Sequence, residues 1–512
     1  MLGELPPRLG LGAAGPVKTR PGRGRCRVRG PLAGATFLLL AGPVAAQTLG
    51  QAGNRADPGP ADLPAQAAST GQPAEPDSQG SISTSLPAAL ADPAGLRSTL
   101  KAAGITSRLI YIGEGFGLAR GGIRRGGSYQ GRLEWQLDAD LDTLAGLSGL
   151  ALHGNLYQIH GHGLSGCCLG NLLTTSSIDA LPATRLSELW AEQKLFDDKV
   201  AIRAGQLAAD AEFLVSDYAG LFVNATFGWP GIAAANLPNG GPAYPTATPG
   251  IRLKLAPADQ VAVMAAVFNG DPVGPGGQSP PQRRDRSGFE FRTSDAALLM
   301  GEVAYGYGQA GAEPRLPGTV KLGGWHHLGR FGDQRTGTDG LSLADPNSGG
   351  IARRLSGNSG VYGVVDQLLY RVPGTADGGV GMFVRASASP GDRNLVSAYL
   401  DGGITFKGLL PGRPADTFGV AAGYAAISPQ ARGLDRDAQL FGAAAGAPFG
   451  PRRSREAVIE ATYQAQIVPG FTIQPDVQHV IRPGGNVANR RDPNGAPVRN
   501  ATVLGLRASL RY

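Results

Sequence analysis

The stretch Arg132–Leu141, RLEWQLDADL, alternates strictly between polar and apolar side chains. Its apolar residues occupy the odd positions from 133 to 141, and its charged or amidic residues occupy the even positions from 132 to 140. Because successive side chains of a β-strand point to opposite faces, this stretch predicts a strand with one apolar and one polar face. The polar face would meet solvent in a water-soluble sheet and the lumen in a membrane-spanning barrel. This stretch alone fits both architectures.

Segments of the same kind recur from residue 105 to residue 512. The recurring alternation of 8 to 13 residues predicts sixteen strands. They fall at about residues 105–112, 128–141, 149–159, 186–195, 200–207, 246–255, 261–268, 297–307, 319–328, 360–370, 379–388, 395–407, 417–427, 456–467, 471–482 and 501–512.

The connections between these segments separate the two architectures. Short turns at 196–199, 256–260 and 468–470 would lie at one rim, and long loops at the other. An even strand number with this sorting predicts an all-β fold, a transmembrane antiparallel β-barrel with short periplasmic turns and long extracellular loops. A β-sandwich has no reason to sort its connections in this way. The long loops are predicted at 160–185, 208–245, 269–296, 329–359, 428–455 and 483–500.

The first 46 residues have the pattern of a secretory signal peptide. Seven basic residues and one acidic residue precede an uncharged stretch around Phe37–Leu40, which ends in Val44-Ala45-Ala46. Without residues 1–46, the formal net charge falls from +7 to about +1. A nucleic-acid partner would need a concentrated basic face, which the remaining chain does not indicate.

Residues 47–103 are rich in Ala, Pro, Gly, Ser and Gln, and we expect them to form a disordered periplasmic leader. Residues 104–512 would then form the barrel. A membrane-spanning helix needs about 20 apolar residues without Pro or charge. The longest uncharged run, Ala219–Ile251, contains five prolines. The composition therefore excludes a helical membrane protein.

Hairpin register predicts which polar groups meet inside the barrel. If Leu195 faces Val200, then Glu192 faces Arg203, a carboxylate and guanidinium pair on the lumen side. In the hairpin closed at Pro469 and Gly470, Gln466 would oppose Thr472 and Thr462 would oppose Asp476. The same rule points further charged residues inward: Arg252, Lys254, Glu290, Arg292, Glu302, Lys321, Arg385, Asp401 and Lys407.

A lumen with both signs of charge and several aromatic rings suits neutral polyhydroxylated solutes. Charged groups hydrogen-bond to hydroxyls in both senses, and ring faces accept the C–H face of a sugar. An anion-selective pore would instead need Arg and Lys rings without matching carboxylates. The alternative is that these residues only solvate the lumen and brace the wall. The candidate pore-lining residues are Asp138, Glu188, Trp190, Glu192, Arg203, Trp325, Arg385, Asp401 and Asp476.

Several motifs carry a resemblance to a known family. They are YQIHG at 157–161, LWAEQ at 189–193, IRAGQL at 202–207, SDYAGLF at 216–222, AVFNGD at 266–271 and GVYGV at 360–364. Together they resemble the carbohydrate-selective porin family of the OprB type over residues 104–512.

The resemblance implies a sixteen-stranded barrel that passes glucose and related sugars through the outer membrane by facilitated diffusion. It also implies a constriction lined by charged side chains and inward-folded loops. By matching position, Glu192 and Arg203 would belong to that constriction, together with Asp217 and Asp271 at loop bases.

Motifs for other chemistry are weak. Gly163-Leu164-Ser165-Gly166 lacks the spacing of a nucleophile elbow. His160-Gly161-His162 and His326-His327 have no acidic or thiol partner at ligand spacing, so we expect neither a metal nor a cofactor. Cys167-Cys168 would be either a vicinal disulfide or two free thiols. We therefore predict a protein without enzymatic activity. A barrel hydrolase and a surface protein that acts through its long loops are the alternatives.

The expected partners are neutral sugars and outer-membrane lipid. The last predicted strand alternates and ends in the aromatic Tyr512, which resembles the recognition signal for the barrel-assembly machinery. Assembly into homo-oligomers is left open by the sequence.

Overall fold

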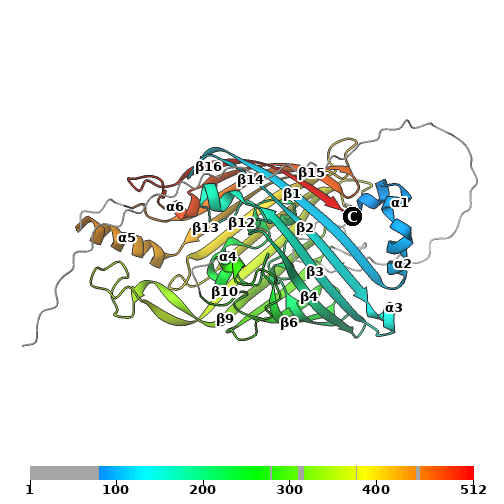
Figure 1. Cartoon of the computed structure of the whole chain (residues 1–512), viewed down its shortest axis with the longest axis horizontal. Coiled ribbons are helices and arrows are strands. Elements are labelled where there is room, and N and C mark those ends of the chain that lie inside the picture. Colours follow the sequence, from blue (N-terminus) through cyan, green and yellow to red (C-terminus); the bar gives the residue numbers. More distant parts are fainter. Residues whose placement is uncertain (1–79, 277–279, 309–315, 376, 445–449) are drawn as a thin grey trace, which may run out of the picture. The chain divides into compact units, whose positions relative to one another are not determined.

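The computed structural model describes residues 80–276, 280–308, 316–375, 377–444 and 450–512 (Figure 1). The predicted signal peptide, 1–46, and the predicted leader up to residue 79 lie outside the described residues.

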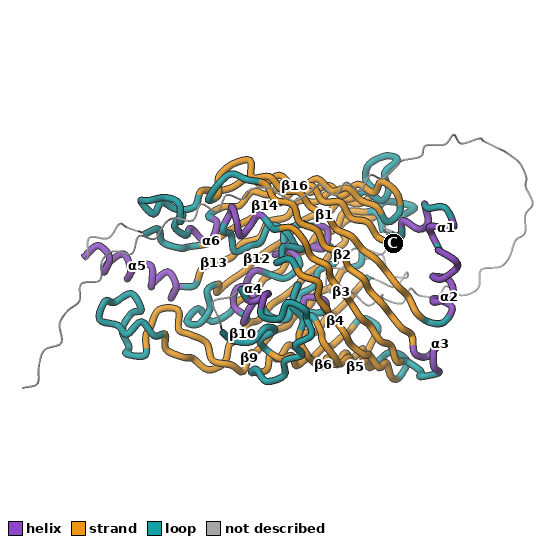
Figure 2. The backbone as a smooth tube through the Cα atoms, viewed as in Figure 1, coloured by secondary structure: helices purple, strands orange, loops and turns teal. Residues whose placement is uncertain are grey.

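Sixteen antiparallel strands of the described chain form one closed barrel in which β1 pairs with β16 (Figures 1 and 2). The predicted all-β barrel is therefore confirmed. The strands are β1 (Ile105–Gly122), β2 (Gly127–Asp140), β3 (Leu150–Gly161), β4 (Ala183–Leu195), β5 (Val200–Leu207), β6 (Thr248–Ala258), β7 (Val261–Asn269), β8 (Ala297–Tyr307), β9 (Gly318–Gly337), β10 (Ala352–Arg371), β11 (Gly379–Ala388), β12 (Val396–Lys407), β13 (Thr417–Ile427), β14 (Arg455–Val468), β15 (Phe471–Ile481) and β16 (Arg499–Arg511).

The predicted hairpin registers are also confirmed. Leu195 pairs with Val200, which places Glu192 opposite Arg203. In the hairpin of β14 and β15, Gln466 pairs with Thr472 and Thr462 pairs with Asp476. Register matters because a slip of one residue would exchange the lumen face for the lipid face.

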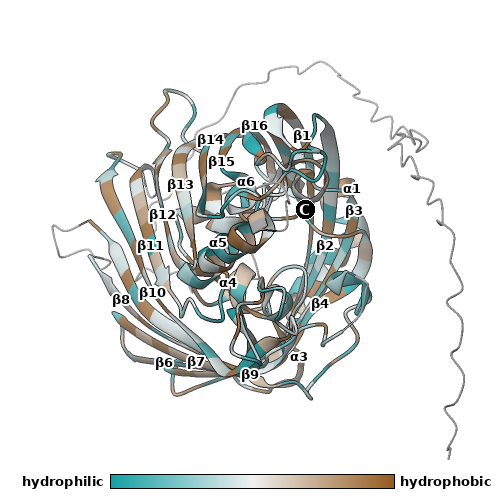
Figure 3. Ribbon diagram, turned by 90° about the vertical axis from the view of Figure 1, so that its left-hand side faces the viewer, coloured by the Kyte–Doolittle hydropathy of each residue, from teal (hydrophilic) through white to brown (hydrophobic). Residues whose placement is uncertain are grey.

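Alternation separates an apolar outer face from a polar inner face along each strand. In β4, the outward Leu189 is 49% exposed, whereas the neighbouring inward Trp190 is 6% exposed. The same alternation of polar and apolar residues runs along the strands in Figure 3. Apolar side chains on the outside match the hydrocarbon of a membrane, where every backbone polar group must be paired within the wall. No helix among the described residues is long and apolar enough to cross a membrane.

Two predictions at the long-loop rim need correction. Residues 329–359 were expected to be a long loop, but much of this segment extends β9 and β10, which have 20 residues each. Spanning the membrane takes about 9–11 residues, so these strands continue beyond it, where alternation is not required. Glu290 and Arg292 are not on a strand but in the loop between β7 and β8, where Arg292 forms an ion pair with Asp295 at 3.0 Å.

Short helices occupy residues 80–103, the part of the expected disordered leader that the structure describes. The backbone N–H groups of Arg97 and Ser98 donate to the Asp92 carboxylate, which stabilises the start of a helical turn. The segment also contacts the end of β16: the Tyr512 hydroxyl donates to the Leu90 carbonyl at 2.6 Å, and Arg97 lies 4.5 Å above the Tyr512 ring. The helices are the 3-10 helices η2 (Ile82–Ser85) and η3 (Pro93–Gly95) and the α-helices α1 (Ala88–Ala91) and α2 (Leu96–Ala102).

The other helices lie in the connections between strands. α3 (Leu141–Ala145) follows β2, and α4 (Gly231–Asn236) lies in the loop between β5 and β6. The remaining helices are α5 (Pro429–Ala444), α6 (Pro483–Asn486), the single π-helical turn η4 (Ser165–Leu169), and the 3-10 helices η5 (Ala209–Ala211), η6 (Ala219–Leu221), η7 (Ala225–Phe227), η8 (Pro238–Gly240) and η9 (Pro281–Arg283).

The outer face can be tested with a charge near the middle of β12. Leu400 points outward and is 52% exposed. We expect Leu400→Arg to lower the free energy of unfolding in phospholipid vesicles by about 2–4 kcal/mol, because a guanidinium in hydrocarbon loses its hydration. Urea titration followed by tryptophan fluorescence measures this change. Leu440→Arg, on the exposed face of α5, should change it by less than about 0.5 kcal/mol. Equal effects at both positions would contradict a lipid-facing wall at Leu400.

Candidate functional site

The loop between β5 and β6, residues 208–247, folds into the interior of the barrel. We call it the inserted loop. Seen from the end with the long loops, its helix α4 lies within the ring of strands (Figure 3). Large apolar side chains of this loop are buried, among them Phe213, Leu214, Phe222, Phe227 and Ile232. The loop therefore fills part of the barrel with a hydrophobic core.

This core joins the inserted loop to the far wall of the barrel. The ring of Phe383, on β11, lies 5.9 Å from Phe222 and 6.2 Å from Phe227. Val458 of β14 and Tyr399 of β12 belong to the same buried cluster. Burying apolar side chains contributes about 1.5–3 kcal/mol each, so the loop is held by packing.

Inward carboxylates of the wall accept hydrogen bonds from the loop backbone. Glu460, on β14, accepts from the N–H groups of Val223 at 2.6 Å and Asn224 at 2.9 Å. Glu302, on β8, accepts from the N–H of Leu214 at 3.1 Å. A buried carboxylate without partners would be costly, and these contacts satisfy both oxygens of Glu460 and one oxygen of Glu302 while fixing the course of the loop.

Arg385 and Asp401, both predicted to point inward, form a buried pair on β11 and β12. The Arg385 guanidinium donates to Asp401 at 3.0 and 2.5 Å. It also donates to the carbonyls of Leu214 and Thr226, each at 2.9 Å. Tyr399 donates to the same Asp401 carboxylate at 2.7 Å. The pair is covered by the inserted loop, and its geometry is that of an anchor.

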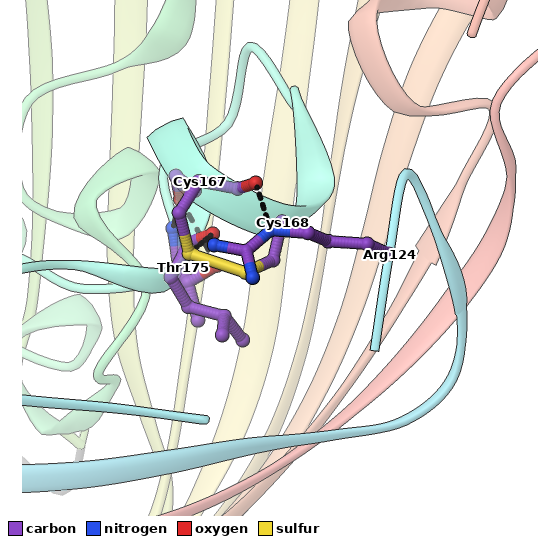
Figure 4. The surroundings of a disulfide bond; sticks show 6 residues. Arg124, Cys167, Cys168 and Thr175 are labelled. Atoms are coloured by element: carbon purple, nitrogen blue, oxygen red, sulfur yellow. Dashed lines mark hydrogen bonds between the residues drawn. A yellow bond between two sulfur atoms is a disulfide. The ribbon is translucent and has the colours of Figure 1, made fainter. Parts of the chain in front are cut away.

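The loop between β3 and β4 enters the same region and contains a vicinal disulfide between Cys167 and Cys168 (Figure 4). The sequence had left the state of these cysteines open. The N–H of Ile123 and the side chain of Arg124 donate to the carbonyls of Cys168 and Cys167 at 2.8 and 3.2 Å. The disulfide turn is thereby fixed to the hairpin of β1 and β2.

Further along this loop, the backbone meets both the wall and the inserted loop. Glu456, on β14, accepts from the N–H groups of Leu172 and Leu173 at 2.8 and 2.7 Å. The N–H of Ala225 donates to the Thr174 carbonyl at 2.9 Å. Both long loops are thus joined to each other inside the barrel.

Four charged residues form a neutral network at the base of the inserted loop. We call Glu192, Arg203, Glu212 and Arg252 the four-charge network. Arg203 pairs with Glu192 at 2.9 Å and with Glu212 at 2.7 Å. Arg252 pairs with the same two carboxylates, each at 2.7 Å. Two carboxylates and two guanidinium groups with bridging contacts compensate one another, which buried charges require.

An aromatic side chain borders this network. The Arg203 guanidinium lies 3.7 Å above the Trp190 ring, and His153 stacks on that ring with centroids 4.7 Å apart. His153 also contacts the carboxylate of Asp138 at 2.7 Å. β2, β3, β4 and β5 therefore bring Asp138, Trp190, Glu192 and Arg203 into one continuous cluster.

The other predicted pore-lining residues lie elsewhere on the inner wall. Glu188 accepts from the N–H of Ala208, at the start of the inserted loop, at 3.1 Å. Trp325 is buried in the apolar core and stacks on Tyr362. Asp476 accepts from Gln478 at 2.9 Å. All three side chains are buried, and none of them joins the four-charge network.

Sequence reasoning missed Glu212, which belongs to the four-charge network but lies on a loop instead of a strand. The sequence did contain a sign that this loop is buried. Residues 213–227 include three phenylalanines, and a solvated extracellular loop would not need such apolar content. The resemblance also implied inward-folded loops. Of the two loop-base carboxylates, Asp217 is exposed, and Asp271 accepts from the Asn239 side chain at 2.6 Å.

Asp210 is a buried carboxylate within the inserted loop. Burial is the largest influence on its pKa and raises it to about 7, and a hydrogen bond from the N–H of Tyr244 at 2.9 Å opposes the shift. Among the described residues, no three His, Cys, Asp or Glu side chains are grouped as metal ligands.

A closed sixteen-stranded barrel with an apolar outer face, a polar inner face and loops folded into its interior defines an outer-membrane porin. The model of the "Carbohydrate-selective porin, OprB family" matches residues 124–512. The chain belongs to this family, and its place is the outer membrane of the cell.

Two relatives illustrate the likeness. Porin B of Pseudomonas aeruginosa is 23% identical over 416 residues, which cover 77% of this chain and 87% of the relative. The high-pH structure of Pseudomonas putida OprB matches with a TM-score of 0.71 at 20% identity, over 82% of this chain and 97% of that one. The second comparison shows the shared fold.

The raised pKa of Asp210 makes stability depend on pH. The folded protein favours the protonated carboxyl, so this contribution is fully present below the unfolded pKa of 3.8 and is lost as the pH rises through about 7. Relative to Asp210→Asn, we expect the wild type to lose about 2 kcal/mol of unfolding free energy between about pH 5 and pH 8. Urea titrations at both pH values measure this. Asp197→Asn, in the exposed turn after β4, serves as the control. A constant difference between wild type and Asp210→Asn would contradict the buried, protonated state.

Proposed function

We propose that this porin carries neutral sugars of the glucose type by facilitated diffusion, and that the four-charge network with Trp190 forms the solute-contacting part of its path. The family supports the class of solute, and the composition of this cluster supports the preference for neutral molecules. The two arginines and two glutamates cancel, so the network presents hydrogen-bonding groups without net charge.

The cluster offers the two kinds of contact that a pyranose can use. Its guanidinium groups donate to hydroxyl oxygens, and its carboxylates accept from hydroxyl hydrogens. The Trp190 ring lies beside them, with the Arg203 guanidinium above it and His153 stacked on it. The single observation that carries the proposal is this pairing of a charge-balanced network with an aromatic ring at the base of the inserted loop.

The other candidate residues divide by role. Glu188, Arg385 and Asp401 bond to the inserted loop or are covered by it, which supports a bracing role in holding the constriction. Trp325 and Asp476 are buried in the wall, which supports the same role. Asp138 orients His153 against Trp190 and thereby supports the solute-contacting cluster.

We further propose outer-membrane lipid as the partner of the apolar outer face, and recognition of β16 with its terminal Tyr512 by the barrel-assembly machinery. The outward leucines support the first, and the alternating pattern of β16 supports the second. Homo-oligomer formation, which the sequence leaves open, is not part of this proposal.

Sugar influx into proteoliposomes tests the role of the four-charge network. Glu192→Gln combined with Arg203→Gln keeps the net charge but removes one carboxylate and one guanidinium of the network. We expect glucose influx at low concentration to fall about fivefold, since loss of one net hydrogen bond is worth about 1 kcal/mol. Chloride conductance in planar bilayers should change less than about twofold, because the net charge is the same.

The matched control is Asp333→Asn with Arg353→Gln. This pair also bridges neighbouring strands, at 2.8 Å, but Arg353 is 55% exposed and the pair lies in the extensions of β9 and β10. Its glucose influx should equal that of the wild type. Equal glucose influx in both double variants would show that the four-charge network is not part of the sugar path. A wild type that admits no glucose would reject the proposed function itself.

A further inference from the structure

A second polar site lies at the long-loop ends of β13, β14 and β15. A pocket of about 480 Å³ opens there, and five of its eight lining residues are arginines. α5 contributes Arg432 and Arg436, the segment before β14 contributes Arg452 and Arg453, and Arg482 follows β15. None of these residues belongs to the four-charge network.

The positive charge of this pocket is almost uncompensated. Arg453 forms an ion pair with Asp435 at 2.7 Å. Within the described part of the chain, no carboxylate lies within ion-pair distance of the other four arginines. The nearby Asp437 is engaged elsewhere, since both of its oxygens accept from Arg335 at 2.7 and 2.9 Å.

Two of the arginine side chains, those of Arg452 and Arg482, are held by neutral contacts. Arg482 donates to the Ser454 hydroxyl at 2.8 Å, and Arg452 donates to the Gln439 side chain at 2.5 Å. The Asn486 amide donates to the Arg452 carbonyl at 2.9 Å. The first two bonds fix the guanidinium groups of Arg482 and Arg452 without neutralising them, and the third fixes the backbone of Arg452.

Such an arrangement favours an anion. Arg432 and Arg436 are four residues apart on α5, where like charges repel and destabilise a helix. An anion between them would attract both guanidinium groups and offset this repulsion. Planar guanidinium groups match the geometry of phosphate and carboxylate oxygens and bind them with paired hydrogen bonds. The pocket volume falls in the range of small-molecule sites, about 300–1,000 Å³.

We propose that this arginine pocket binds an anion bearing a phosphate or carboxylate group at the extracellular mouth of the barrel. The anion is either a free acidic solute or the phosphate of an outer-leaflet lipid headgroup, and the chemistry of recognition is shared. The proposal goes beyond the passage of neutral sugars and does not depend on it, because the pocket and the four-charge network share no residue.

Titration calorimetry of the full chain in neutral detergent tests the site with inorganic phosphate and with D-glucuronate at constant ionic strength. The test variant is Arg432→Gln with Arg436→Gln. Both side chains are exposed. The control is Arg490→Gln with Arg491→Gln, which removes the same charge from exposed positions outside the pocket. We expect the test variant to bind about tenfold more weakly than the control, because two forked donors are lost.

A second arm distinguishes the source of the anion. The protein is reconstituted with phosphatidylcholine and lipid A, re-extracted, and the retained lipid A is measured by mass spectrometry. Tighter binding of the soluble anions by the control than by the test variant supports a free solute. Lower retention of lipid A by the test variant than by the control variant supports a headgroup phosphate. The proposal is overturned if the two variants behave alike in both arms. Glucose influx, measured in parallel, should be unchanged in both variants, so a failure of sugar transport would be recognised separately.

Discussion

The need to pair every backbone N–H and C=O inside hydrocarbon governs this protein, and the closure of β1 on β16 meets it. Closure leaves no free strand edge in the membrane. Every second side chain of a strand then faces lipid, so only half of the side chains of each strand point into the interior. The wall can therefore supply isolated polar groups at fixed spacing, and the interior needs backbone from elsewhere to complete its contacts. The two long loops that enter the barrel supply that backbone.

The inner charges of the wall are used in two ways. Glu460, Glu302 and Arg385 bond to the inserted loop, and these contacts stabilise buried groups that would otherwise lack partners. In the four-charge network, Glu192 and Arg203 compensate each other together with Glu212 and Arg252. The hydrogen bonds to the inserted loop are directional and fix its position. The four-charge network has no net charge and can therefore lie beside a neutral solute. The same residue types thus hold the inserted loop at one wall and form the candidate solute contact at the other.

Much of the fold could be predicted because the alternation of apolar and polar residues in a barrel strand indicates which side chains face lipid and which face the interior. The pairing of Glu192 with Arg203 followed from turn length and alternation alone. The course of the inserted loop did not follow, because it depends on contacts such as that of Phe227 with Phe383, which join residues more than 150 positions apart in sequence. The extensions of β9 and β10 were missed since alternation weakens beyond the membrane. Helices in residues 80–103 were missed because their composition resembles a linker.

The attachment of the inserted loop to the wall has a consequence for how such channels diversify. The segment between Leu207 and Thr248 is continuous in sequence, and it packs on an inner face that lipid never contacts. Substitutions within it can reshape the cross-section without altering hydrophobic thickness or strand pairing. Conversely, the outer face can adapt to a different lipid composition without changing the inserted loop. Two selective pressures thus act on separate sets of residues within one chain.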